Sequence, residues 1–78
     1  MNKIKPEEFS KMSLLKKYNL LKERGNFIAS RQHGGHLCHL FAFDGFYVEV
    51  FRVIGLNQVH WIELVKNNST LDTYLDNL

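Results

Sequence analysis

The sequence of 78 residues contains one cysteine, Cys38, and one proline. A single cysteine forms neither an internal disulfide nor an all-cysteine metal site, which is typical of a protein from a reducing compartment. No apolar run approaches the roughly 18 residues that a membrane-spanning helix needs. The first residues also lack the apolar stretch of a secretion signal. We therefore expect a cytoplasmic protein that makes no contact with a membrane.

The composition is that of a folded chain, with 45% hydrophobic, 13% aromatic and 23% charged residues. This excludes a disordered tail or a low-complexity linker. The length suits one domain, which we place over residues 1–78. Charge is unevenly distributed, because residues 1–31 hold eight Lys or Arg against three Asp or Glu. Residues 32–78 hold two Lys or Arg against five Asp or Glu, so the second part of the chain is acidic.

Residues 13–24 are predicted to form the main helix. Four apolar residues recur there at helical spacing: Leu14, Leu15, Tyr18 and Leu21. Ser13 is a typical N-cap and Gly25 a typical stop. Pro6 followed by two glutamates predicts a short helical turn upstream.

Aromatic and β-branched residues between glycine-rich turns predict four strands. We place them at residues 26–33, 36–43, 46–54 and 58–65, joined by Gly34-Gly35, Asp44-Gly45 and Gly55-Leu56-Asn57. Residues 69–78 predict a short closing helix, because Leu71, Tyr74, Leu75 and Leu78 form an apolar stripe. The expected class is α+β: an N-terminal helix, a four-stranded antiparallel meander and a short C-terminal helix.

Turn lengths predict the strand register and therefore the two faces of the sheet. Ile28 is placed opposite Phe41, Arg52 opposite His60, and Glu49 opposite Glu63. The first face, predicted to pack on the helices, holds Ile28, Leu37, Phe41, Phe43, Phe46, Val48, Val50, Ile62 and Leu64. The second face holds Phe27, Ala29, Leu40, Ala42, Tyr47, Phe51, Val53, Val59 and Trp61, with both glutamates.

The apolar second face indicates a binding surface, because a solvated face of an antiparallel sheet is polar. An exposed apolar patch of this extent marks a partner, and a self-complementary sheet contact gives a homodimer. We expect that surface to centre on four residues: Leu40, Tyr47, Phe51 and Trp61. Short helices covering part of both faces are the alternative.

A histidine-rich hairpin is the candidate metal site. His33 and His36 flank the Gly34-Gly35 turn, and Cys38 shares a face with His36. His39 points to the other face, and the spacing matches no known metal motif. A polar hairpin tip with a half-buried cysteine is the favoured interpretation, so we expect no metal and no cofactor.

Two other groups of charged residues were weighed for function. Glu49 and Glu63, if adjacent, could serve as an acid and base pair beside aromatic rings that suit a sugar. Lys16, Lys17, Lys22 and Arg31 could contact the phosphates of a nucleic acid. A solvated helix face is the favoured explanation of the lysines, and the sequence has no nucleotide-binding motif.

Residues 14–45 resemble the HicA-type toxins, small RNases of the double-stranded-RNA-binding fold. The similarity lies in Leu14-Leu15-Lys16-Lys17, Gly25, Arg31-Gln32-His33-Gly34-Gly35-His36 and Asp44-Gly45. It implies that His36 is the base for RNA cleavage by the RNA's own 2′-hydroxyl. Gly35 stands where that family has a serine.

Three stretches resemble short bacterial α+β proteins with no known activity. They are residues 24–31, 44–50 and 69–75. This similarity supports the fold and implies no function. The sequence as a whole favours a non-enzymatic protein-interaction module that forms a homodimer, with another protein as a further candidate partner. A HicA-like toxin or RNA-binding protein using His36 is the alternative, so nucleic acid is the less favoured partner.

Overall fold

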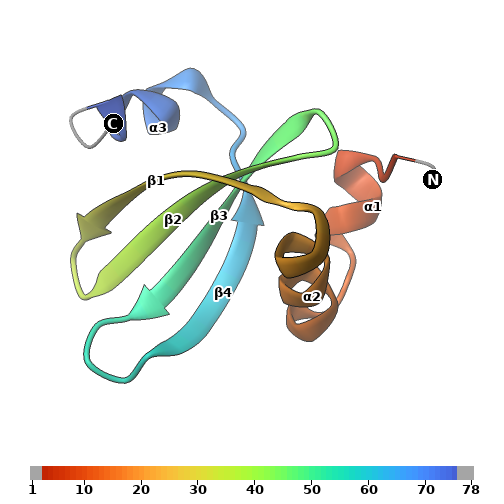
Figure 1. Cartoon of the computed structure of the whole chain (residues 1–78). Coiled ribbons are helices and arrows are strands. Elements are labelled where there is room, and N and C mark those ends of the chain that lie inside the picture. Colours follow the sequence, from red (N-terminus) through yellow and green to blue (C-terminus); the bar gives the residue numbers. More distant parts are fainter. Residues whose placement is uncertain (1–2, 76–78) are drawn as a thin grey trace.

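The computed structural model describes residues 3–75, which form three helices and a four-stranded sheet. The elements are α1 (Pro6–Ser10), α2 (Leu14–Arg24), β1 (Asn26–His33), β2 (His36–Phe43), β3 (Phe46–Val53), β4 (Gln58–Leu64) and α3 (Asn68–Asp72). Neighbouring strands pair antiparallel in the order β1-β2-β3-β4 (Figure 1). The predicted α+β class and the meander are confirmed. Within residues 3–75, the helices lack the length and apolar character needed to cross a membrane.

Helix α2 begins and ends where local chemistry predicts. The Ser13 hydroxyl accepts a hydrogen bond from the Lys16 backbone N–H at 3.2 Å. Gly25 ends the helix, and a Cβ at this position would lie 2.6 Å from the Leu21 carbonyl oxygen. The predicted apolar stripe is only half right: Leu21 is buried, whereas Leu15 is 69% exposed. Leu15 lies at the edge of a hollow that it shares with Arg52 and Val59, where solvent reaches it.

The register between β2 and β3 is the predicted one. The Asp44-Gly45 turn has positive φ angles of 47° and 89°, as a type I′ hairpin turn requires. Phe43 therefore pairs with Phe46, and the ladder continues without interruption along both strands. Between β3 and β4, the predicted pairing of Glu49 with Glu63 is also confirmed.

Two predicted pairings are wrong, and a register shift accounts for each. In β1 the register shifts between Phe27 and Ala29, so Phe27 pairs with Phe41 and Ile28 is the extra residue. In β4 the turn before the strand spans residues 54–57, one residue longer than predicted. Arg52 consequently pairs with Val59 instead of His60.

Hydrophobic residues are buried on both faces of the sheet. Helices α1 and α2 cover the first face over a core of Phe9, Leu21, Phe43, Val48, Val50 and Ile62. The α3 segment covers the second face over Ala29, Cys38, Leu40, Phe51 and Tyr74. Figure 1 shows α3 on the side of the sheet away from α1 and α2. The two faces therefore have separate cores, and short helices cover part of each.

The closing helix is shorter than predicted. Its N-cap is Asn67, whose side chain accepts a hydrogen bond from the Thr70 backbone N–H at 3.1 Å. The helix ends at Asp72, although Tyr74 beyond it is fully buried. Leu75 is 61% exposed, so it does not continue the apolar stripe. The predicted position of Leu78 in that stripe lies outside the described residues.

Candidate functional site

The residues expected to form the aromatic contact surface are divided between buried and exposed positions. Leu40 and Phe51 are 4% and 5% exposed because Tyr74 and its neighbours pack over them. The expectation that these two side chains are accessible is therefore wrong. Tyr47 is 41% exposed and Trp61 is partly buried against the same cluster. The structure does not assemble the four residues into one open patch.

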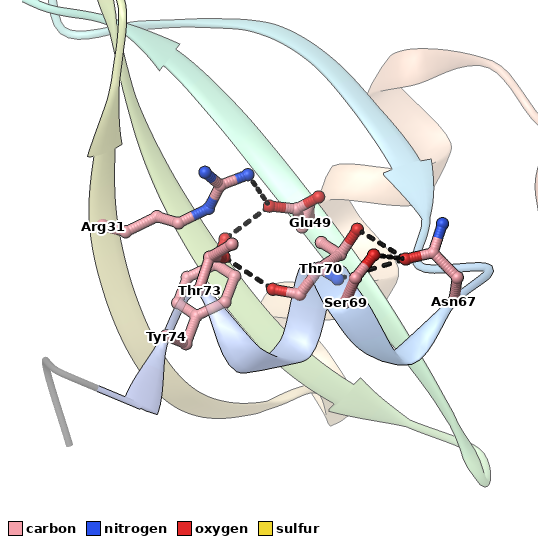
Figure 2. Close-up of polar contacts among 7 residues, drawn as sticks. All are labelled: Arg31, Glu49, Asn67, Ser69, Thr70, Thr73 and Tyr74. Atoms are coloured by element: carbon pink, nitrogen blue, oxygen red, sulfur yellow. Dashed lines mark hydrogen bonds and ion pairs between the residues drawn. The ribbon is translucent and has the colours of Figure 1, made fainter.

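A buried polar network attaches the α3 segment to the second face. The Tyr74 hydroxyl donates to Glu49 Oε2 at 2.6 Å, and Arg31 Nη2 donates to the same oxygen at 3.2 Å (Figure 2). Burial and the hydrogen bond to Glu49 raise the pKa of Tyr74 well above its ordinary value. The phenol therefore keeps its proton and remains a donor. Both bonds go to the same carboxylate oxygen of Glu49.

The glutamate pair does not provide an acid and a base. Glu49 and Glu63 are adjacent in the sheet, as predicted. However, Glu49 is 3% exposed and paired with Arg31, whereas Glu63 is exposed to solvent. Because Glu49 is buried and already bonded to Arg31 and Tyr74, it is not open to a substrate beside Glu63. The network holds the C-terminal segment in place.

His33, His36 and Cys38, the alternative metal ligands, do not converge. Cys38 is fully buried, and burial raises the pKa of its thiol. Because the thiolate is the form that binds metals, a buried protonated thiol is a poor ligand. His36 instead contacts His60, which the sequence analysis did not place beside it. Within residues 3–75, no group of three or more His, Cys, Asp or Glu side chains is arranged to hold a metal ion.

The proposed nucleic-acid contacts lie on different parts of the molecule. Lys17 Nζ donates to the Ile62 carbonyl oxygen at 3.3 Å, and the Lys22 ammonium lies 5.4 Å from the centre of the Tyr18 ring. Lys16 is exposed at the start of α2. Arg31 is on the opposite sheet face, paired with Glu49. The fold does not bring the four cations into one phosphate-binding surface.

His36 is also separated from the basic helix. Its ring packs against Phe51 and Trp61, with ring centres 6.0 and 4.8 Å away. These are second-face residues, whereas α2 packs on the first face. An RNA strand held by the α2 lysines would therefore have to pass around the sheet to reach His36.

An apolar groove of about 360 Å³ lies between α2 and the first face. We call it the basic groove, and its lining residues are Tyr18, Leu21, Lys22, Phe27, His39, Phe41, Val50 and Arg52. Leu21 and Val50 are buried at its base, whereas Phe27 is 58% exposed at its side. The Phe27 and Phe41 rings meet edge to face with centres 5.8 Å apart. The groove therefore presents aromatic surface to solvent.

The ionisable groups that line the basic groove are all basic except for the Tyr18 phenol. His39 Nδ1 is 2.8 Å from the Ser30 hydroxyl oxygen, which fixes the imidazole ring within the groove. Burial lowers the pKa of His39, and the positive charge of Arg52 lowers it further. His39 is therefore neutral at physiological pH, and the permanent charges are those of Lys22 and Arg52. None of the described residues that line this groove carries a carboxylate.

Arg52 lies where the basic groove adjoins two shallower hollows. One hollow, of about 340 Å³, includes Leu14 and Val59, and the other, of about 250 Å³, includes Leu37 and Ile54. The guanidinium donates to Tyr18 Oη and to Asn57 Oδ1, each at 3.4 Å. Sequence reasoning missed Arg52 as a site residue. The available signal was the alternation of β3, which puts Arg52 two residues beyond Val50.

The fold places the chain in the α+β class, as an open four-stranded antiparallel sheet with helices on both faces. Comparison with protein-family models, with curated proteins and with solved structures found no match.

Proposed function

We propose that the protein is a small interaction module that binds an acidic, amphipathic segment of a partner protein in the basic groove. The observation that carries this proposal is the lining of the groove, in which aromatic walls accompany Lys22 and Arg52 and no carboxylate is present. Apolar side chains of a bound segment would cover Phe27 and Phe41. Its Asp or Glu side chains would pair with the two cations.

Arg52 is the central recognition residue in this proposal. A guanidinium pairs with a carboxylate through two parallel hydrogen bonds, which adds geometric selectivity to charge attraction. Its present hydrogen bonds, both 3.4 Å long, are weak enough to be exchanged for bonds to a partner. The groove volume is at the lower end of the roughly 300–1,000 Å³ range of ligand sites. It therefore suits a few side chains of a peptide.

Charge favours a different protein over a second copy as the occupant. Two copies meeting groove to groove would oppose Lys22 and Arg52 of one copy with the same residues of the other. Like charges across an interface cost affinity. A head-to-tail contact between groove and acidic surface would not close into a dimer. A heteromeric complex is therefore favoured over the homodimer expected from the sequence.

A peptide-display selection on the immobilised full chain tests the proposal. The expected winners combine aromatic or aliphatic residues with Asp or Glu. The affinity of the best peptide should fall roughly tenfold to a hundredfold in Arg52→Glu, because a charged hydrogen bond is worth about 1.5–3 kcal/mol. Lys11→Glu is the matched control, since it makes the same charge change at an exposed position outside the groove.

Three outcomes would overturn the proposal. Selection could enrich neutral or basic peptides, or Arg52→Glu could bind the acidic peptide as well as the unchanged chain does. Sedimentation could also show a dimer at micromolar protein that Arg52→Glu dissociates, in which case the occupant is a second copy. Amide chemical-shift changes on adding the peptide should be confined to the groove. Circular dichroism establishes that each variant is folded.

A further inference from the structure

The register shift in β4 places two histidines in contact. Phe51 pairs with Trp61 and Arg52 with Val59, so His60 is the extra residue between two ladder positions. A bulge changes the direction of a side chain, and bulges are frequent beside functional sites. Here His60 lies beside His36 of β2, with β3 between their strands. This contact is independent of the basic groove, whose lining does not include either residue.

The two imidazoles have facing nitrogen atoms. His36 Nε2 and His60 Nδ1 are 2.9 Å apart, and the rings stack with an interplanar angle of 21°. Both rings also pack against Trp61, with ring centres 4.8 and 4.6 Å from that indole. His60 is exposed and His36 partly buried. The pair is therefore supported from below by Trp61 and open to solvent above.

We propose that His36 and His60 form a two-nitrogen binding site for Cu²⁺. Metal–imidazole bonds are about 2.0–2.1 Å long, so two nitrogens at 90° around one metal ion lie about 2.9 Å apart. The two nitrogens are held 2.9 Å apart by a hydrogen bond, so a turn of the exposed His60 ring is enough to bring both lone pairs to one ion. Tetragonal nitrogen and oxygen sites select Cu²⁺ or Ni²⁺, and Cu²⁺ binds the more strongly of the two. Cu²⁺ also binds imidazole nitrogen more strongly than Zn²⁺ does.

Metal binding replaces the hydrogen bond between the rings. In the neutral pair one facing nitrogen carries the proton and the other accepts it. For both to ligate, the donor ring transfers that proton through solvent to its other nitrogen, so no net proton is released. The exposed His60 ring turns to direct its lone pair at the metal. Within residues 3–75 no three-residue ligand group forms, so water or an external ligand takes the remaining positions.

Trp61 gives a direct readout, because it is the only tryptophan in the sequence and touches both rings. Cu²⁺ bound at the pair should quench most of the Trp61 fluorescence when copper chloride is added to untagged protein in a non-chelating buffer. The copper concentration for half-quenching should rise at least tenfold in His36→Ala and in His60→Ala. His33→Ala is the control and should leave it unchanged.

Electron paramagnetic resonance tests the ligand set separately and should show two nitrogen ligands in the equatorial plane of Cu²⁺. Equal quenching in His60→Ala and the unchanged chain would overturn the site. Displacement of Cu²⁺ by an equal concentration of Zn²⁺ would overturn the metal assignment. If His36→Ala does not fold, as judged by circular dichroism, His60→Ala still decides the question because its ring is exposed.

Discussion

Removal of one hydroxyl, in Tyr74→Phe, tests how the C-terminal segment is held. Tyr74 is 1% exposed, and its hydroxyl donates to the buried Glu49 carboxylate at 2.6 Å. A hydrogen bond to a charged group contributes about 1.5–3 kcal/mol. Glu49 keeps its ion pair with Arg31, so no unpaired charge is left. We expect the free energy of unfolding to fall by about 1.5–3 kcal/mol.

That loss is large for a chain of this size. Domains are stable by about 0.05–0.15 kcal/mol per residue, which gives roughly 4–12 kcal/mol here. Tyr74→Ala would also remove the ring, at about 3–5 kcal/mol, and could release the whole segment. Tyr74→Phe keeps the ring in place and isolates the hydroxyl. It is therefore the more informative change.

Urea unfolding followed by circular dichroism measures the free energy of unfolding of the whole chain. The rate at which a reagent labels the Cys38 thiol measures local opening of the α3 segment. This thiol is fully buried in the cluster that includes Tyr74, and α3 packs over it. If the segment opens before the sheet unfolds, thiol labelling in Tyr74→Phe should accelerate roughly tenfold to a hundredfold. The matched control is Tyr47→Phe, since Tyr47 is 41% exposed. Equal stability and equal labelling in the two variants would refute the reasoning.

Two further predictions concern the other side of the molecule. Gly25→Ala should lower the free energy of unfolding by about 1–3 kcal/mol, because the added Cβ would lie 2.6 Å from the Leu21 carbonyl oxygen. Thermal unfolding measures this loss, and an unchanged midpoint temperature would contradict the prediction. His39 should contribute to pH dependence, because its lowered pKa means that the unfolded chain binds a proton more readily. The contribution of His39 to stability is fully present above pH 6.5, its ordinary pKa, and is lost as the pH falls through its lowered pKa in the folded chain. Urea titrations should therefore show a shallower loss of stability below pH 6.5 in His39→Asn, and equal slopes would exclude His39.

The turns and the central hairpin could be predicted because their information is local. Asp44-Gly45 requires two positive φ angles, which fixes a two-residue loop and the pairing of Phe43 with Phe46. The Ser13 cap and Gly25 stop of α2 are equally local. Each of these features depends on a few adjacent residues.

The covering of the second face could not be predicted in the same way. The contact between Tyr74 and Glu49 joins residues 25 positions apart, and nothing in the spacing of Leu71 and Tyr74 says which sheet face they meet. The apolar surplus on that face was correctly identified. Its main cover is the chain's own segment, which buries Leu40 and Phe51. That cover leaves Leu40 and Phe51 inaccessible to a partner.

Each candidate site contains a residue from a strand segment whose predicted pairing was wrong. Strict alternation placed Phe27 on the second face, but the shift before Ala29 pairs it with Phe41 and makes it a wall of the basic groove. The shift in β4 likewise brings His60 beside His36. A bulge interrupts the hydrogen-bonded ladder and changes the direction of a side chain, and bulges are frequent beside functional sites. Failures of local rules concentrate at functional sites for that reason. The two shifts thus point to the same places as the groove and the histidine pair.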